Sequence, residues 1–153
     1  MYRLLNAFAL VVFCTLLCAL PNRLQAQTLT AAAAVTHNTT DNPIQDTGTF
    51  SITWSGVPSG STVQGHLYMV ITYKYALMRN TVETIDVQDT SVFTSSSGSN
   101  APSFDLYPLT IIANNAPFPN YTEADYYYTS SCNCSNGTSS KSVQTQQFSI
   151  AFD

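Results

Sequence analysis

The chain has 153 residues, and the first 26 have the features of a signal peptide, so 127 residues remain for one ordinary domain. Those 127 residues carry three basic and nine acidic side chains, a net charge of −6, which excludes nucleic-acid binding because phosphates require clustered Lys and Arg. They also contain 36 Ser and Thr and 15 aromatic residues, a composition that excludes disorder and favours strands over helices. We therefore expect an all-β domain over residues 27–153.

The N-terminal segment predicts export. Arg3 precedes an apolar run over Leu4–Leu20, and Pro21 and a small residue at Ala26 follow it. This pattern is typical of a signal peptide over residues 1–26, cleaved before Gln27. The alternative is an uncleaved membrane anchor, because about 17 apolar residues are near the lower limit for crossing a bilayer. Cleavage predicts a secreted or extracellular protein, periplasmic or at the cell surface in a bacterium, without stable membrane insertion.

Alternating apolar residues indicate strands in the first half of the domain. A strand of small residues is expected over Leu29–Thr36, and Gly48–Trp54 alternates three apolar side chains with Ser and Thr. A turn rich in Gly and Pro follows. In Thr62–Leu77 every odd position from Leu67 onward is apolar or aromatic, which is the strongest periodic signal in the chain.

The second half of the domain predicts further short strands and no regular helix. The expected segments are one or two exposed strands over Thr81–Thr94, a loop over 95–103, a strand over Ser103–Ile112 with Pro108 at an edge or bulge, a connection over 113–121, a strand over Glu123–Ser131, and a last strand over Lys141–Phe152. Short strands at this spacing indicate an antiparallel two-sheet sandwich of about seven to eight strands.

Two stretches resemble the fibronectin type III and immunoglobulin-like families. FSITWSGVP, followed by Tyr68, resembles strands B and C of a fibronectin type III domain, in which a Trp ends strand B. PNYTEADYYY resembles the approach to strand F, where Tyr126 would form the tyrosine corner. EADYY is also similar to strand F of an immunoglobulin variable domain, although Tyr128 stands at the position of the disulfide Cys. The resemblance implies an immunoglobulin-like or fibronectin III-like sandwich with Trp54, Tyr68 and Tyr126 in its core.

Cys132 and Cys134 are the two cysteines that follow the leader. Export places them in an oxidising compartment, where disulfides form. Residues i and i+2 of a regular strand are about 6.5 to 7 Å apart, near the limit for a disulfide, so a bridge requires a turn or bulge. Asn136 and Gly137 favour a turn here, and we expect a local disulfide staple. The alternative is a redox-active or intermolecular thiol pair.

Four Asn residues begin Asn-X-Ser/Thr sequences, which are glycosylation acceptors in a host that glycosylates exported chains. These candidate glycosylation sites are Asn38, Asn120, Asn133 and Asn136.

Catalytic and metal-binding motifs are not found in the sequence. His37 and His66 lie in no zinc or nucleophile motif, so we predict no enzyme, no catalytic residue, no metal site and no cofactor. Calcium is the alternative at two oxygen-rich clusters, Glu83 with Asp86 and Asp89, and Asp41 with Asn42 and Asp46. On a strand, however, Asp86 would point away from the other two carboxylates of its cluster, and acidic residues at a sheet edge discourage aggregation.

Tyrosines are the candidate ligand contacts, because exposed Tyr rings stack on sugars and are common at interaction surfaces. Tyr68 is expected on the strand face opposite the apolar stripe, and Tyr127 is expected to face away from Tyr126 and Tyr128. The alternative is that these rings fill the core of a small sandwich.

The favoured function is a non-enzymatic binding, adhesion or surface-structural module with a protein or glycan partner. The alternative is a carbohydrate-binding protein with Tyr and Trp platforms.

Self-association is a further hypothesis. The final strand has no following tail in this sequence, and Leu29–Thr36 has few features that would fix its register. Either strand could pair with a second molecule at a sheet edge. The alternative is that both strands pair within the monomer.

Overall fold

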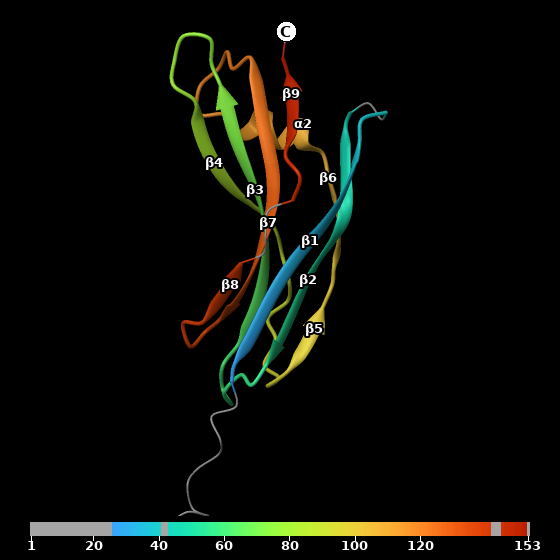
Figure 1. Cartoon of the computed structure of the whole chain (residues 1–153), viewed down its shortest axis with the longest axis vertical. Coiled ribbons are helices and arrows are strands. Elements are labelled where there is room, and N and C mark those ends of the chain that lie inside the picture. Colours follow the sequence, from blue (N-terminus) through green and yellow to red (C-terminus); the bar gives the residue numbers. More distant parts are fainter. Residues whose placement is uncertain (1–25, 41–42, 142–144, 153) are drawn as a thin grey trace, which may run out of the picture.

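A computed structural model describes residues 26–40, 43–141 and 145–152. These residues form nine strands and one helix, and the strands make two antiparallel sheets that face each other (Figure 1). The expected all-β sandwich is therefore confirmed, with nine strands in place of seven or eight. Residues 1–25 of the predicted leader lie outside the described residues. Within the described part, no helix has the length and apolar character needed to span a membrane.

The first sheet has four strands and is called the four-stranded sheet. It contains β1 (Thr28–Asn38), β2 (Gln45–Ser55), β5 (Gly98–Asn100) and β6 (Ser103–Leu106). β1 pairs with β2 over its whole length, and the other edge of β2 pairs with β6 and then with β5. The expected N-terminal strand thus pairs inside the monomer, and its register is set by β2.

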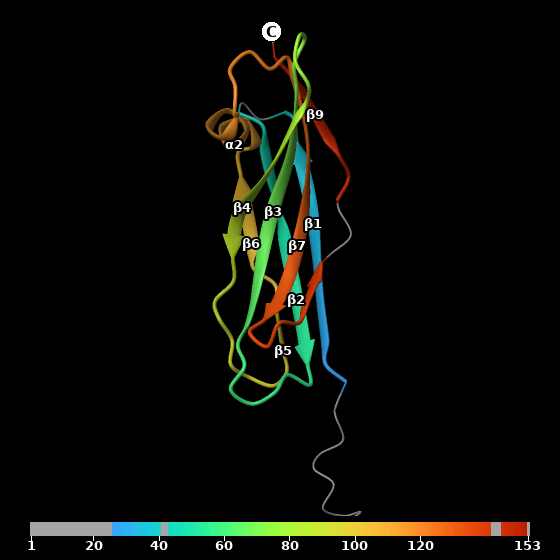
Figure 2. The ribbon, with the colours of Figure 1, turned by 90° about the vertical axis from the view of Figure 1, so that its left-hand side faces the viewer.

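The second sheet has five strands and is called the five-stranded sheet; Figure 2 looks onto it. It contains β3 (Val63–Lys74), β4 (Thr81–Asp89), β7 (Glu123–Cys134), β8 (Ser139–Lys141) and β9 (Phe148–Ala151). β3 and β7 form the centre, with β4 on one side and β8 and β9 on the other. Every second residue of β3 is buried, as the sequence periodicity predicted.

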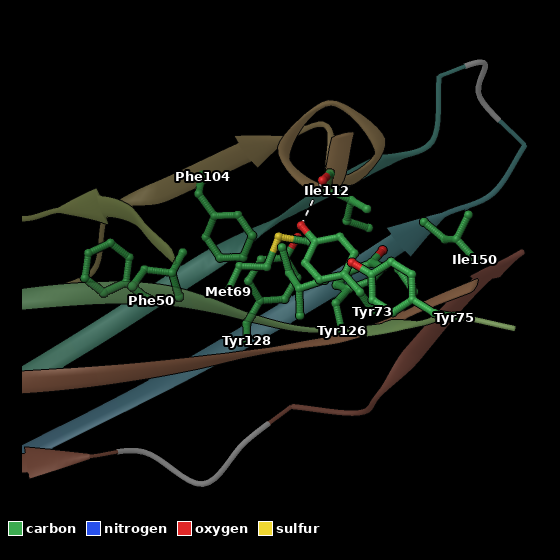
Figure 3. Packing of buried hydrophobic residues seen from close by; sticks show 12 residues of the cluster. Phe50, Met69, Tyr73, Tyr75, Phe104, Ile112, Tyr126, Tyr128 and Ile150 are labelled. Atoms are coloured by element: carbon green, nitrogen blue, oxygen red, sulfur yellow. Dashed lines mark hydrogen bonds between the residues drawn. The ribbon is translucent and has the colours of Figure 1, made fainter. Parts of the chain in front are cut away.

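The core lies between the sheets, and Figure 3 shows its larger cluster. Aromatic rings from both sheets fill it, including Phe50, Tyr73, Tyr126 and Tyr128, all with no exposed surface. Trp54 belongs to a second, smaller cluster and is 3 % exposed. Its indole Nε1 donates to the Ser95 carbonyl at 3.0 Å. The prediction that Trp54 and Tyr126 are core residues is confirmed.

The prediction of no regular helix is wrong, because Pro108–Asn115 forms helix α2 in place of the end of a strand. Pro108 occupies the first turn, where its missing N–H costs nothing. Ile112 is fully buried, and its carbonyl accepts a hydrogen bond from Tyr73 Oη at 2.8 Å (Figure 3). Burial of Ile112 therefore outweighs the strand preference of the β-branched residues around it.

Three other segments differ from expectation. The predicted loop over 95–103 contains the short strand β5, in which Gly98 lies against the Trp54 ring so closely that a Cβ would meet it at 2.6 Å. The last expected strand, Lys141–Phe152, is confirmed only over β9, because β8 ends at Lys141, and Val143 lies outside the described residues. The apolar stripe of β3 ends at Tyr75, and Leu77 is 97 % exposed because β3 stops at Lys74 and the chain turns.

Candidate functional site

The outer face of the five-stranded sheet carries both predicted ligand contacts. Tyr68 on β3 and Tyr127 on β7 are partly exposed there, while Tyr126 and Tyr128 point into the core. Tyr127 pairs with Val70, two residues from Tyr68, so the two rings are diagonal neighbours on one face. The predicted orientations are confirmed, whereas the core position that the family resemblance implies for Tyr68 is wrong. Because Trp54 is buried, it cannot stack on a sugar, and of the predicted Tyr and Trp platforms only the tyrosines remain.

A histidine and two carboxylates gather beside Tyr68. His66 pairs with Asp89, and Tyr68 pairs with Asp86, with a register shift between Leu67 and Tyr68. The shift gives β4 one extra residue, so Asp86 and Asp89, three apart in sequence, both reach the His66 side of the sheet. The prediction that Asp86 points away from Asp89 is wrong, because β4 is not a regular strand. Glu83 remains apart from the cluster.

The three side chains are close enough to interact directly. His66 Nδ1 lies 2.6 Å from Asp89 Oδ1 and 3.3 Å from Asp86 Oδ2, and one ligand atom from each residue falls within 4.8 Å of the others. Partial burial and then the charge of Asp89 raise the pKa of Asp86, while His66 acts in the opposite direction. Among the described residues this is the group whose donor set could hold a metal ion.

An ion-pair cluster joins the two central strands, β3 and β7. Lys74 Nζ lies 2.8 Å from Glu123 Oε1 and 2.7 Å from Asp125 Oδ2, and Ser149 of β9 donates to Asp125. Burial would raise the pKa of Asp125, but the hydrogen bonds from Lys74 and Ser149 outweigh burial and hold this pKa below its usual value. The cluster therefore ties β9 to the sheet and neutralises Lys74.

A buried carboxylate joins the two sheets. Asp46 on β2 is fully buried, and its Oδ2 accepts hydrogen bonds from Tyr128 at 2.7 Å and Tyr126 at 3.0 Å, both from β7. His37 Nδ1 of β1 lies 2.5 Å from Asp46 Oδ1, and the His37 ring stacks on Phe148 at 4.2 Å. Asp46 was predicted only as part of a calcium cluster with Asp41 and Asn42, which lie outside the described residues.

This network changes the interpretation of Tyr126. A tyrosine corner bonds to backbone a few residues upstream, whereas the hydroxyl of Tyr126 reaches side chains 80 and 89 residues away in sequence. The tyrosine-corner assignment is therefore wrong. Burial, and then the neighbouring Asp46 carboxylate, raise the pKa of Tyr126, and burial with the hydrogen bond to Asp46 raises that of Tyr128. Both phenols stay protonated and remain donors to Asp46.

An apolar tip, formed by Leu77, Met78 and Phe118, lies at one end of the sandwich. Leu77 is 97 % exposed, and about half of the Met78 and Phe118 surfaces is exposed, at 52 % and 49 %. The β3–β4 loop and the 116–122 connection lie at the same end in both views (Figures 1 and 2). Tyr75 joins them, because its ring packs edge-on to the Phe118 ring, with centroids 6.2 Å apart, and its hydroxyl donates to the Phe118 carbonyl at 3.4 Å.

Cys132 and Cys134 are free thiols, so the expected disulfide staple is not formed. β7 continues as a regular strand through Cys134, and the turn begins only at Ser135. Both thiols are buried in the smaller core cluster with Trp54. Burial, and then the neighbouring Cys134, raise the pKa of the Cys132 thiol, which favours the unreactive protonated form.

The four candidate glycosylation sites lie in different surroundings. Asn120 and Asn136 are exposed in connections, and Asn38 ends β1 and accepts a hydrogen bond from the Thr40 backbone N–H at 3.0 Å. Asn133 is half-buried within β7 between the two buried cysteines.

Sequence reasoning missed the three groupings that define the surface and the interior. The His66 cluster depends on an extra residue in β4, and the Asp46 network depends on contact between two sheets. Neither leaves a local pattern. The apolar tip did have a signal, since Leu77 and Met78 stand directly before the break at Arg79 and Asn80.

No family model and no curated protein matches this chain. Solved structures that match this chain include a target of the Northeast Structural Genomics Consortium, at 10 % identity and a TM-score of 0.30, covering 84 % of this chain and 89 % of that one. The putative ApaA protein from Bordetella pertussis has 12 % identity and a TM-score of 0.30, with 84 % and 97 % covered. A protein from Archaeoglobus fulgidus has 10 % identity and a TM-score of 0.29, with 82 % and 96 % covered.

Proposed function

We propose that the protein is a secreted or surface-exposed, non-enzymatic binding or adhesion module that contacts a protein partner through the apolar tip. The observation that carries this proposal is that Leu77, Met78 and Phe118, three of the six exposed large apolar side chains among the described residues, lie in segments at one end of the sandwich. Grouped exposed apolar side chains on a soluble domain mark interaction sites, because they cost free energy when left in water.

The chemistry of the tip favours a protein over a sugar or an anionic membrane. Leu77 and Met78 can pack against the apolar surface of a protein partner, and the Phe118 ring beside them has no polar group to bond sugar hydroxyls. Arg79 follows the tip, but nearby Lys74 is neutralised by Glu123 and Asp125. The mature chain is also strongly acidic, which disfavours an anionic lipid surface.

The test is binding of fluorescently labelled mature protein to intact cells of the source organism. We expect saturable binding that is lost when the cells are treated with protease and that Leu77→Asp weakens by about tenfold or more. Val92→Asp is the matched control, since Val92 is also exposed, at 55 %, and lies outside the tip. Equal weakening by both substitutions, or binding that survives protease treatment, would contradict a protein-binding tip.

Carbohydrate binding is the second candidate, favoured by Tyr68 and Tyr127 lying as diagonal neighbours on the outer face of the five-stranded sheet. In this case glycan-array binding should be lost in Tyr127→Ala and retained in Tyr127→Phe, which keeps the ring. Cell binding would then resist protease and disappear after the surface glycans are oxidised. An array without saturable hits rejects this second candidate.

A further inference from the structure

The cluster of His66, Asp86 and Asp89 has the donor set of a transition-metal site. It offers one imidazole nitrogen and two carboxylate oxygens. Calcium takes six to eight ligands, all of them oxygen, whereas zinc takes four, with His and Asp among its common donors. The cluster contains His66 in place of Glu83 of the predicted calcium set, and a nitrogen ligand favours zinc over calcium.

The separation of His66 from Asp86 matches a tetrahedral ion, and Asp89 lies at hydrogen-bond distance from His66 and would move outward when an ion binds. Bonds of about 2.0 to 2.1 Å to a tetrahedral centre place ligand atoms about 3.3 Å apart. His66 Nδ1 already lies 3.3 Å from Asp86 Oδ2 and 2.6 Å from Asp89 Oδ1. A bound ion would take the place of the hydrogen bond between Nδ1 and Asp89 and would offset the repulsion between the two carboxylates.

Neighbouring groups hold the ligands in place. Gln64 Nε2 donates to Asp89 Oδ2 at 3.5 Å and to the Thr90 carbonyl at 3.2 Å, which leaves Asp89 Oδ1 directed at the imidazole. The His66 ring stacks on Tyr68, with centroids 5.9 Å apart and planes inclined by 25°. A metal-binding His is usually oriented by such outer contacts.

An unpartnered hydroxyl lies on the other side of His66. Ser131 of β7 pairs directly with His66, so both side chains project from the outer face of the sheet. Ser131 is only 2 % exposed, and its Oγ has no hydrogen-bond partner among the described residues. Paired side chains lie about 4.5 to 5.5 Å apart at Cβ. From this pairing we assign the Ser131 hydroxyl as the acceptor for Nε2–H when Nδ1 binds a metal.

We propose that His66, Asp86 and Asp89 bind a divalent transition-metal ion of the zinc class, with its remaining position open to solvent. The Asp side chains are 43 % and 47 % exposed, so an ion can reach the site without unfolding the sheet. This site shares no residue with the apolar tip, so a test of one proposal does not decide the other.

Calorimetric titration of the metal-free mature protein with ZnCl₂ tests the site. We expect one ion per chain at micromolar concentration, a rise in Tm, and no comparable binding of CaCl₂ or MgCl₂. His66→Gln, Asp86→Asn and Asp89→Asn should each weaken binding by about tenfold or more. Glu83→Gln is the control, because it removes the same charge from the same strand outside the cluster. Circular dichroism confirms that each variant is folded.

Cobalt substitution identifies the ligands independently of affinity. Co²⁺ at this site should give visible d–d bands of a four-coordinate ion without a sulfur-to-cobalt charge-transfer band, since no thiol belongs to the cluster. A charge-transfer band would assign the metal to Cys132 and Cys134 and overturn the proposal. Binding that is unchanged by His66→Gln, equal for calcium and zinc, or absent at millimolar zinc would overturn it as well.

Discussion

At the scale of single residues, Asp46 is the side chain whose substitution should destabilise the fold most. It is fully buried, it accepts hydrogen bonds from Tyr126 and Tyr128, and it contacts His37. Removal of one member of a buried, hydrogen-bonded charge network leaves its partners unsatisfied, which costs about 3 to 5 kcal/mol. We therefore expect Asp46→Ala to lower the free energy of unfolding by about this amount in urea denaturation.

The three consecutive tyrosines provide a matched comparison on the same strand. Tyr128→Phe removes a buried donor and should cost about 1 to 2 kcal/mol in the same denaturation experiment. Tyr127→Phe changes a hydroxyl on the outer face and should stay within about 0.5 kcal/mol of the wild type. Equal effects at the two positions would mean that the Asp46 network does not stabilise the fold.

At the scale of elements, β9 is short but well attached. It pairs with β7, Ile150 enters the core, Ser149 bonds to Asp125, and Phe148 stacks on His37. Deletion of Ser149–Asp153 should therefore prevent folding, as judged by circular dichroism. Ile150→Ala should cost about 2 to 4 kcal/mol, and Ala151→Ser, at the exposed next position, should be near neutral. A truncated chain that stays folded and monomeric while the full-length protein sediments as a dimer would instead support pairing of β9 between molecules.

The elements also show which parts of the fold local sequence can predict. The faces of β3 and β7 follow from alternation alone, because each residue of a regular strand has only two directions available. Helix α2 and the extra residue of β4 could not be predicted in this way. The first depends on burial of Ile112 under Tyr73, and the second on pairing with β3.

At the scale of the whole molecule, the architecture was predictable and the sites were only partly so. The spacing of short strands predicted the sandwich, and the alternation of side chains along each strand predicted that Tyr68 and Tyr127 face solvent. The groupings at His66, Asp46 and the apolar tip join residues that are tens of positions apart. Sequence periodicity carries no information on which strands become neighbours, so these groupings required the structure.

The whole molecule should lose stability in alkaline solution. The pKa values of Tyr126 and Tyr128 are raised in the folded state, first by burial, whereas an unfolded chain ionises its tyrosines near pH 10. Above about pH 10 the unfolded state therefore binds fewer protons than the folded state, and the free energy of unfolding falls as pH rises. Each such tyrosine contributes a decline of up to about 1.4 kcal/mol per pH unit, and none below its unfolded pKa. Urea denaturation between pH 8 and pH 11, with these limits set to bracket the tyrosine pKa of about 10, measures the decline. Tyr128→Phe should make the decline shallower and Tyr127→Phe should not; identical slopes in all three proteins would show that the buried phenols are not held protonated by the fold.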